Sequence, residues 1–128
     1  MNILLVDDDD DARTLTKDLL ASAGHHVTAA ASGFEAIMHV EIQHYDLVLL
    51  DLMMPGVDGF QFAEFMSCHW NTFDTPVIIV SCRKDAESKS LARVFDCAGY
   101  LEKPFSPAEL FDVISGIEPR IARSDTPG

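Results

Sequence analysis

The sequence predicts an α/β protein in which a parallel β-sheet lies between two layers of helices. Five short apolar runs alternate along the chain with five segments whose apolar residues recur at helical spacing. The clearest runs are unbroken, as expected for strands that are covered on both faces. Strands that alternate with helices favour crossover connections, and these place the strands parallel in one sheet.

The first predicted strand, residues 3–6, leads into the first predicted helix. Apolar residues recur there at three- and four-residue steps, which predicts one buried stripe. Gly24 follows the last of them and is expected to end the helix. The predicted stripe consists of Ala12, Leu15, Leu19 and Ala23.

A weaker strand, residues 26–30, precedes a second helix that opens at Ser32 and Gly33. The clearest strand covers residues 47–50 and ends at Asp51. The Pro- and Gly-containing segment 54–59 is incompatible with a strand or a helix and predicts a tight loop. The core stripe expected for the second helix is Phe34, Ile37 and Val40.

Two further strands, residues 77–80 and 100–102, and three further helices complete the pattern. Asp85 and Ser106 are suitable N-caps for the fourth and fifth helices. The residues predicted to face the core are Phe62, Ala63 and Met66 in the third helix, Leu91, Ala92 and Phe95 in the fourth, and Leu110, Val113, Ile114 and Ile117 in the fifth.

Length and charge limit the classes of function. A chain of 128 residues fits one domain, predicted over residues 1–118, with 119–128 as a flexible tail or truncated linker. The net charge of −12 argues against direct binding to nucleic acid or to anionic membranes, and suits a divalent cation or a basic partner.

The N-terminus and the cysteines indicate the compartment. No segment is long enough to span a bilayer, and the N-terminus lacks the basic start of a signal peptide. The three cysteines have no paired spacing, which predicts reduced thiols. We therefore expect a cytoplasmic protein.

Chemically active side chains follow four of the five predicted strands. Asp7 and Asp8 end the first strand, Asp51 the third, Ser81 the fourth and Lys103 the fifth. Open parallel sheets bind ligands beyond the carboxyl ends of their strands. If the first and third strands are neighbours, three carboxylates converge. Two such charges ~4 Å apart cost about 4 kcal/mol at an effective dielectric near 20, a cost that Mg²⁺ would relieve.

Each of these residues also has an ordinary structural interpretation. The run Asp7–Asp11 suits a solvated loop that caps the first helix, because acids favour a helix N-terminus. Lys103 could extend its ammonium into solvent, and Ser81 could be a simple strand-end hydroxyl. What favours one common site is the combination: an acid pair, a single acid, a hydroxyl and a lysine follow the first, third, fourth and fifth strands in this order.

The same segments resemble the receiver domains of two-component response regulators, over about residues 2–117. The resemblance implies a flavodoxin-like, doubly wound sheet of five parallel strands in the order 2-1-3-4-5, with five helices. The matching segments are Ile3-Leu4-Leu5-Val6-Asp7-Asp8, Asp46-Leu47-Val48-Leu49-Leu50-Asp51-Leu52-Met53-Met54-Pro55-Gly56, Pro76-Val77-Ile78-Ile79-Val80-Ser81 and Gly99-Tyr100-Leu101-Glu102-Lys103-Pro104-Phe105.

By this resemblance, Asp51 accepts a phosphoryl group from a phosphohistidine of a sensor histidine kinase or histidine phosphotransfer protein. Asp8, Asp51 and the backbone carbonyl of Met53 are the implied Mg²⁺ ligands, and Asp7 would contribute partly through water. Such a domain is a signalling switch in a phosphorelay; it catalyses only its own phosphorylation and dephosphorylation.

The resemblance also implies how the signal leaves the site. Ser81 would bond a phosphoryl oxygen, Lys103 would pair with the new charge, and Tyr100 would be the switch residue. The output partner or domain would bind the face formed by the fourth helix, the fifth strand and the fifth helix, and the same face could join two copies in a dimer.

Two other functions are compatible with parts of the pattern. A receiver-like docking module that is never phosphorylated would keep the fold without the chemistry. A small aspartyl-phosphate hydrolase also places an aspartate at a strand end, but usually has a second acid two residues later, where this chain has Met53, and a cap domain for which there is no room.

Overall fold

The computed structural model describes residues 1–51, 59–69, 72, 74–82 and 97–125. The strands are β1 (Asn2–Val6), β2 (His26–Ala30), β3 (Leu47–Asp51), β4 (Val77–Cys82) and β5 (Gly99–Lys103). The helices are α1 (Asp10–Ser22), α2 (Gly33–Ile42), α3 (Gly59–Cys68) and α5 (Pro107–Asp125). The helix predicted after Asp85 lies outside the described residues.

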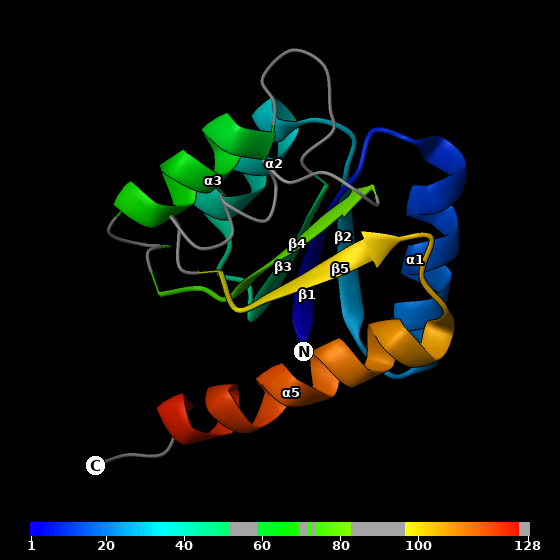
Figure 1. The fold of residues 1–128 in the computed structure, drawn as a ribbon. Helices are drawn as coiled ribbons and strands as arrows, with labels where there is room; N and C mark the ends of the chain where they lie inside the picture. The colour runs from blue at the N-terminus through cyan, green and yellow to red at the C-terminus, as the bar shows by residue number, and fades with distance from the viewer. Residues whose placement is uncertain (52–58, 70–71, 73, 83–96, 126–128) are drawn as a thin grey trace.

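The strands form one sheet in the order β2-β1-β3-β4-β5, and all four pairings are parallel (Figure 1). The predicted fold class and strand order are therefore confirmed. α5 continues to Asp125, beyond residue 118. The division into a domain and a tail stays a prediction.

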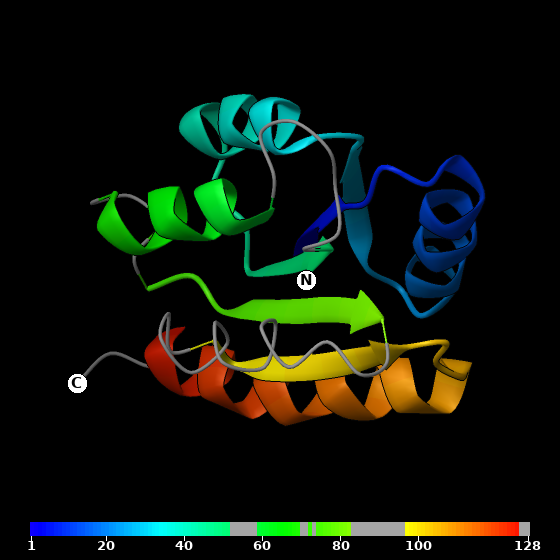
Figure 2. The same cartoon turned by 45° about the horizontal axis from the view of Figure 1, so that its top comes forward.

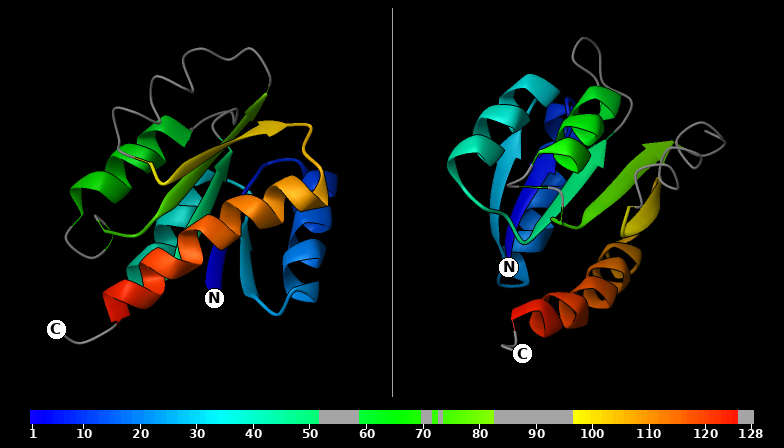
Figure 3. Two further views of the ribbon diagram at one scale, coloured as in Figure 1. Left: turned by 60° about the horizontal axis from the view of Figure 1, so that its bottom comes forward. Right: turned by 90° about the vertical axis from the view of Figure 1, so that its left-hand side faces the viewer.

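Helices cover both faces of the sheet, which accounts for the unbroken apolar strands. Figures 2 and 3 show the helices flanking the sheet. One buried cluster joins alternate strand residues to α2 and α3, and the second joins the intervening residues to α1 and α5. Leu4 and Leu50 belong to the first cluster, Leu5 and Leu49 to the second.

Local signals in the sequence set where the helices begin and end. Asp9 caps α1 by accepting from the N–H groups of Asp11 and Ala12, and Ser32 caps α2 by accepting from the N–H of Glu35. Ser106 caps α5 and exchanges two 3.1 Å bonds with Glu109, a capping box. Gly24, just beyond α1, has φ = +93°, a left-handed conformation that glycine adopts without strain.

The buried face of α1 differs from the prediction. Thr16 and Leu20 are buried, whereas Leu15 is 63% exposed and Ala23 is also exposed. Leu15, Leu19 and Leu20 allow two overlapping stripes of helical period, and the sequence alone favours the more apolar one. Packing on the sheet selects the stripe that contains Thr16, so the prediction for Leu15 was wrong.

The prediction for α2 was also partly wrong. Val40 is buried and Ile37 is partly buried, as predicted, but Phe34 is 63% exposed. Ala36 takes the buried place instead. A small residue lets the helix backbone approach the sheet, and this rotation carries the larger Phe34 ring outwards. The predictions for α3 and α5 were confirmed, with Phe62, Ala63, Met66, Leu110, Ile114 and Ile117 buried and Val113 partly buried.

Within the described residues, no helix combines the length and apolarity needed to cross a bilayer.

The difference between the predicted and the observed buried face of α1 generates a stability prediction. Leu20→Ala should lower the free energy of unfolding by about 2–5 kcal/mol, because it opens a cavity in a closed core. Leu15→Ala removes the same atoms from an exposed position and should change the free energy of unfolding by about 0.5 kcal/mol or less. Urea unfolding followed by circular dichroism measures both, and equal losses would mean that Leu15 belongs to the core.

Candidate functional site

Two buried carboxylates lie side by side at the carboxyl edge of the sheet. In the pairing of β1 with β3, Val6 is opposite Leu50. The next residue on each strand is an aspartate, Asp7 and Asp51, and both are buried. Because parallel neighbours end at the same edge, the register itself brings these two side chains together.

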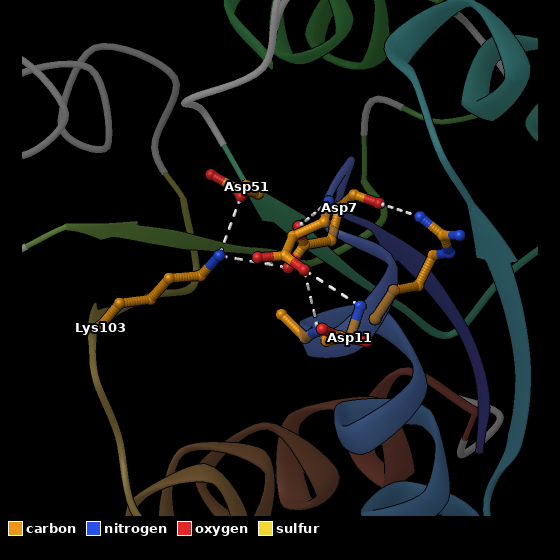
Figure 4. Close-up of polar contacts among 7 residues, drawn as sticks. Asp7, Asp11, Asp51 and Lys103 are labelled. Carbon is orange, nitrogen blue, oxygen red and sulfur yellow. Dashed lines mark hydrogen bonds and ion pairs between the residues drawn. The ribbon is translucent and has the colours of Figure 1, made fainter.

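Lys103 reaches this pair from a strand that is not adjacent to either of them. Its Nζ donates to Asp51 Oδ2 at 2.9 Å and to Asp7 Oδ2 at 3.2 Å (Figure 4). β4 separates β5 from β3, so the long side chain extends across the end of that strand. One ammonium thereby bridges two carboxylates, and such charge-assisted bonds are the stronger kind.

Asp8 completes a group of three acids. Single carboxylate oxygens of Asp7, Asp8 and Asp51 lie within 4.8 Å of one another, with Asp8 exposed. One ammonium balances only part of this negative charge. Closely spaced carboxylate oxygens, open to water on one side, are the donors that a hard divalent cation such as Mg²⁺ prefers.

Burial and charge shift the pKa values of two of these groups. Burial raises the pKa of Asp7, with the nearby Asp51 charge adding to it, against the opposing effects of the Asp9 N–H and Lys103. Burial alone would lower the pKa of Lys103, but its hydrogen bond and charge interaction with Asp51, helped by Asp7, raise it overall. The lysine is therefore held charged, whereas ionising Asp7 costs free energy.

The loop between β1 and α1 is held by its own acids. The Asp7 carboxylate accepts from the N–H of Asp9 at 2.9 Å, and Asp9 in turn accepts from the N–H groups of Asp11 and Ala12. The residues of the acidic run therefore have different roles: Asp9 caps the helix, while Asp7 and Asp8 belong to the group of three acids.

Arg13 is a site residue that the sequence analysis missed. Its Nη1 donates to the backbone carbonyl of Asp7 at 2.9 Å, and its guanidinium pairs with Asp10. This contact fixes the backbone from which the Asp7 side chain projects. The available signal in the sequence was an acid three residues before an arginine on the same helix, a spacing that favours an ion pair.

The remaining predicted residues lie on β4, on β5 or outside the described part of the chain. Ser81 is buried one residue beyond Val80, the sheet partner of Asp51. Tyr100, opposite Ile79 in the register, is partly buried against the α2–α3 cluster. Met53 falls outside the described residues.

A cavity of about 470 Å³ opens beside the cluster, between α1 and the segment that leads into α5. Asp7, Asp51 and Lys103 line one part of it, and the rest is mainly apolar, including Leu15 and Phe105. Another molecule can therefore approach the Asp51 carboxylate from this side.

Comparisons with known proteins agree with this geometry. A family model described as a response regulator receiver domain matches residues 3–115. Protein PilG of Pseudomonas aeruginosa is 30% identical over 125 residues, which are 98% of this chain and 93% of that protein. The probable transcriptional regulator ycf27 of Porphyridium aerugineum is 31% identical over 97% of this chain, which spans only 50% of that relative. The structure of the Vibrio cholerae chemotaxis protein CheY4 superposes with a TM-score of 0.85 at 28% identity, covering 91% of this chain and 97% of that one.

The raised pKa of Asp7 generates a prediction about pH. Its ionised form destabilises the folded protein, and this cost is present above the folded pKa and vanishes as pH falls below the unfolded value of 3.8. Asp7→Asn should therefore be more stable than the wild type at about pH 7 and lose that advantage towards about pH 3.

Urea unfolding in the presence of a metal chelator measures this difference at each pH. Asp18→Asn, at an exposed position on α1, is the matched control and should show no such pH-dependent gain. An advantage of Asp7→Asn that is the same at both pH values would contradict the assignment.

Proposed function

The chain belongs to the family of response regulator receiver domains, and on this premise we propose that it is a switch operated by phosphorylation of Asp51. The observation that carries the proposal is the Asp51 carboxylate, held 2.9 Å from the Lys103 ammonium within a group of three acids. Strand-end position, burial and an open side next to a cavity all suit a nucleophile.

The reaction moves a phosphoryl group from nitrogen to oxygen. A carboxylate oxygen of Asp51 bonds to phosphorus, the phosphorus–nitrogen bond of a phosphohistidine breaks, and its electron pair returns to the imidazole ring. The donor is a sensor histidine kinase or a histidine phosphotransfer protein. The product is an acyl phosphate, and the protein's own contribution is positioning and charge neutralisation.

Mg²⁺ is the cofactor we propose, and the donor set supports it. Asp7, Asp8 and Asp51 supply hard oxygen donors within 4.8 Å of one another. The backbone carbonyl of Met53 is the further ligand implied by the family. When bound, the ion neutralises charge on the transferring phosphoryl oxygens.

The response starts with a change in the partners of Lys103. The unmodified Asp51 shares this ammonium with Asp7. Phosphorylation replaces the single negative charge of the Asp51 carboxylate with a phosphoryl group that carries about −1.5 to −2 and three acceptor oxygens. Lys103 then pairs with the phosphate, and the Ser81 hydroxyl donates to a phosphoryl oxygen.

Tyr100 is the residue that would carry this change to a partner. It lies on the same strand as Lys103 and packs against the α2–α3 cluster, so movement at the end of β4 and β5 reaches it directly. We propose that it alters the face made by the fourth helix, β5 and α5. An output partner or domain, or a second copy, binds there.

The domain bounds, the compartment and the excluded activities follow from the same proposal. We place the domain at residues 1–118, with 119–128 as a tail or linker, in the cytoplasm, where phosphorelay kinases act. The chain is not an enzyme with an external substrate, and it does not bind nucleic acid or a membrane directly.

A phosphorylation test separates this function from its two rivals. With Mg²⁺ and a small phosphodonor, the protein should gain about 80 Da by mass spectrometry, and Asp51→Asn should gain nothing. Asp74→Asn, an exposed acid before β4, should behave as the wild type. No gain in the wild type would indicate a docking module, and continuous release of phosphate would indicate a hydrolase.

A metal titration tests the proposed ligands. Mg²⁺ at tenfold excess over its dissociation constant should stabilise the protein by about 1.4 kcal/mol, since it binds only the folded state. Asp8→Asn should lose most of this gain in thermal unfolding with and without Mg²⁺. Asp11→Asn, exposed in the first turn of α1, should keep it. Equal losses in both variants would show a diffuse charge effect in place of a coordinated ion.

A further inference from the structure

Helix α2 carries an exposed apolar ridge. The described residues include four large apolar side chains that are exposed, and three of them lie on α2: Phe34 at 63%, Met38 at 56% and Ile42 at 82%. They are spaced four residues apart, so they follow one another along a single side of the helix. The opposite side of α2 packs on the sheet through Ala36 and Val40.

Carboxylates border this ridge on both sides. Viewed down the helix axis at 100° per residue, Glu41 projects next to Phe34 on one edge of the ridge, and Glu35 projects next to Ile42 on the other, each about two turns away along the axis. Both are exposed, and the sequence of α2 contains no lysine or arginine. His39 lies 3.8 Å from Glu35.

The surroundings of α2 are equally acidic. The sequence has no lysine or arginine between Lys17 and Arg83, a segment that includes eight Asp and Glu residues. α3, which packs beside α2, exposes Glu64 and has no basic residue. Among the described residues, α2 and α3 therefore present a negatively charged surface that contains no lysine or arginine.

We propose that the α2 ridge is a docking site for a basic amphipathic helix of another protein. Apolar anchors spaced by one helical turn match the apolar stripe of such a helix, and lysines or arginines beside that stripe would meet Glu35 and Glu41. Two α2 ridges facing each other would bring like charges together, so a second copy of this chain fits less well. Anionic lipid is disfavoured for the same reason.

The ridge is separate from the phosphorylation site. It lies on the outer side of α2, whereas the cavity beside Asp51 is lined by α1 and the start of α5. We therefore expect the docking site to bind its partner whether or not Asp51 is phosphorylated. It is a second interaction surface besides the face proposed for output.

The test uses a synthetic amphipathic helical peptide of leucine and lysine as the probe. Its titration into the isotopically labelled protein, followed by NMR, should shift the amide signals of α2 most strongly. The dissociation constant should rise about tenfold or more in Met38→Gln/Ile42→Gln, as for the loss of two central apolar anchors. Glu35→Gln/Glu41→Gln should weaken binding and reduce its dependence on salt.

Matched controls make the result specific. Leu15→Gln removes an equally exposed leucine from α1 and should leave the dissociation constant unchanged. A leucine–glutamate peptide of the same length should not bind. Because all of the substituted positions are exposed, thermal unfolding should show each variant folded.

Three results would overturn the proposal. The first is unchanged affinity in Met38→Gln/Ile42→Gln, and the second is a set of NMR shifts centred away from α2. The third is a dimer in sedimentation velocity that Met38→Gln/Ile42→Gln dissociates, because the ridge would then be covered by a second copy.

Discussion

The shared ammonium of Lys103 is the interaction on which the rest of the site depends. Asp7 and Asp51 are buried next to each other, and two such charges ~4 Å apart repel by about 4 kcal/mol at an effective dielectric near 20. Lys103 contacts both, at 3.2 and 2.9 Å, and so makes a buried acid pair compatible with a folded domain. With Asp8 added, the group still carries excess negative charge, which is the physical reason for a cation to join it.

The parallel sheet is the device that assembles this site from distant parts of the chain. Lys103 is 96 residues from Asp7 and 52 from Asp51 in sequence. The strands all point the same way, so the residues at the carboxyl ends of β1, β3 and β5 emerge at one edge of the sheet. The Lys103 ammonium contacts Asp51 directly, and its strand also carries Tyr100, the residue that we propose as the switch.

The two helical layers have different characters. Beside α1 and α5, the cavity opens onto Asp51, which suits the approach of a phosphate donor. Beside α2 and α3, the surface is acidic and carries an apolar ridge of Phe34, Met38 and Ile42. One sheet therefore separates the side that opens onto Asp51 from the side that carries the apolar ridge proposed as a docking site.

The sequence by itself determined the strands, the caps at Ser32 and Ser106, and the acids and lysine at the strand ends, because these follow from local spacing and side-chain chemistry. It misjudged Leu15 and Phe34, since a helix with several apolar residues offers more than one stripe of the same period. Only the packing of each helix on the sheet chose which stripe was buried. Tertiary structure alone also decided that Lys103 contacts both Asp7 and Asp51. This contact joins the ends of three different strands, so it depends on the strand register and on the reach of the lysine side chain, which no local sequence pattern encodes.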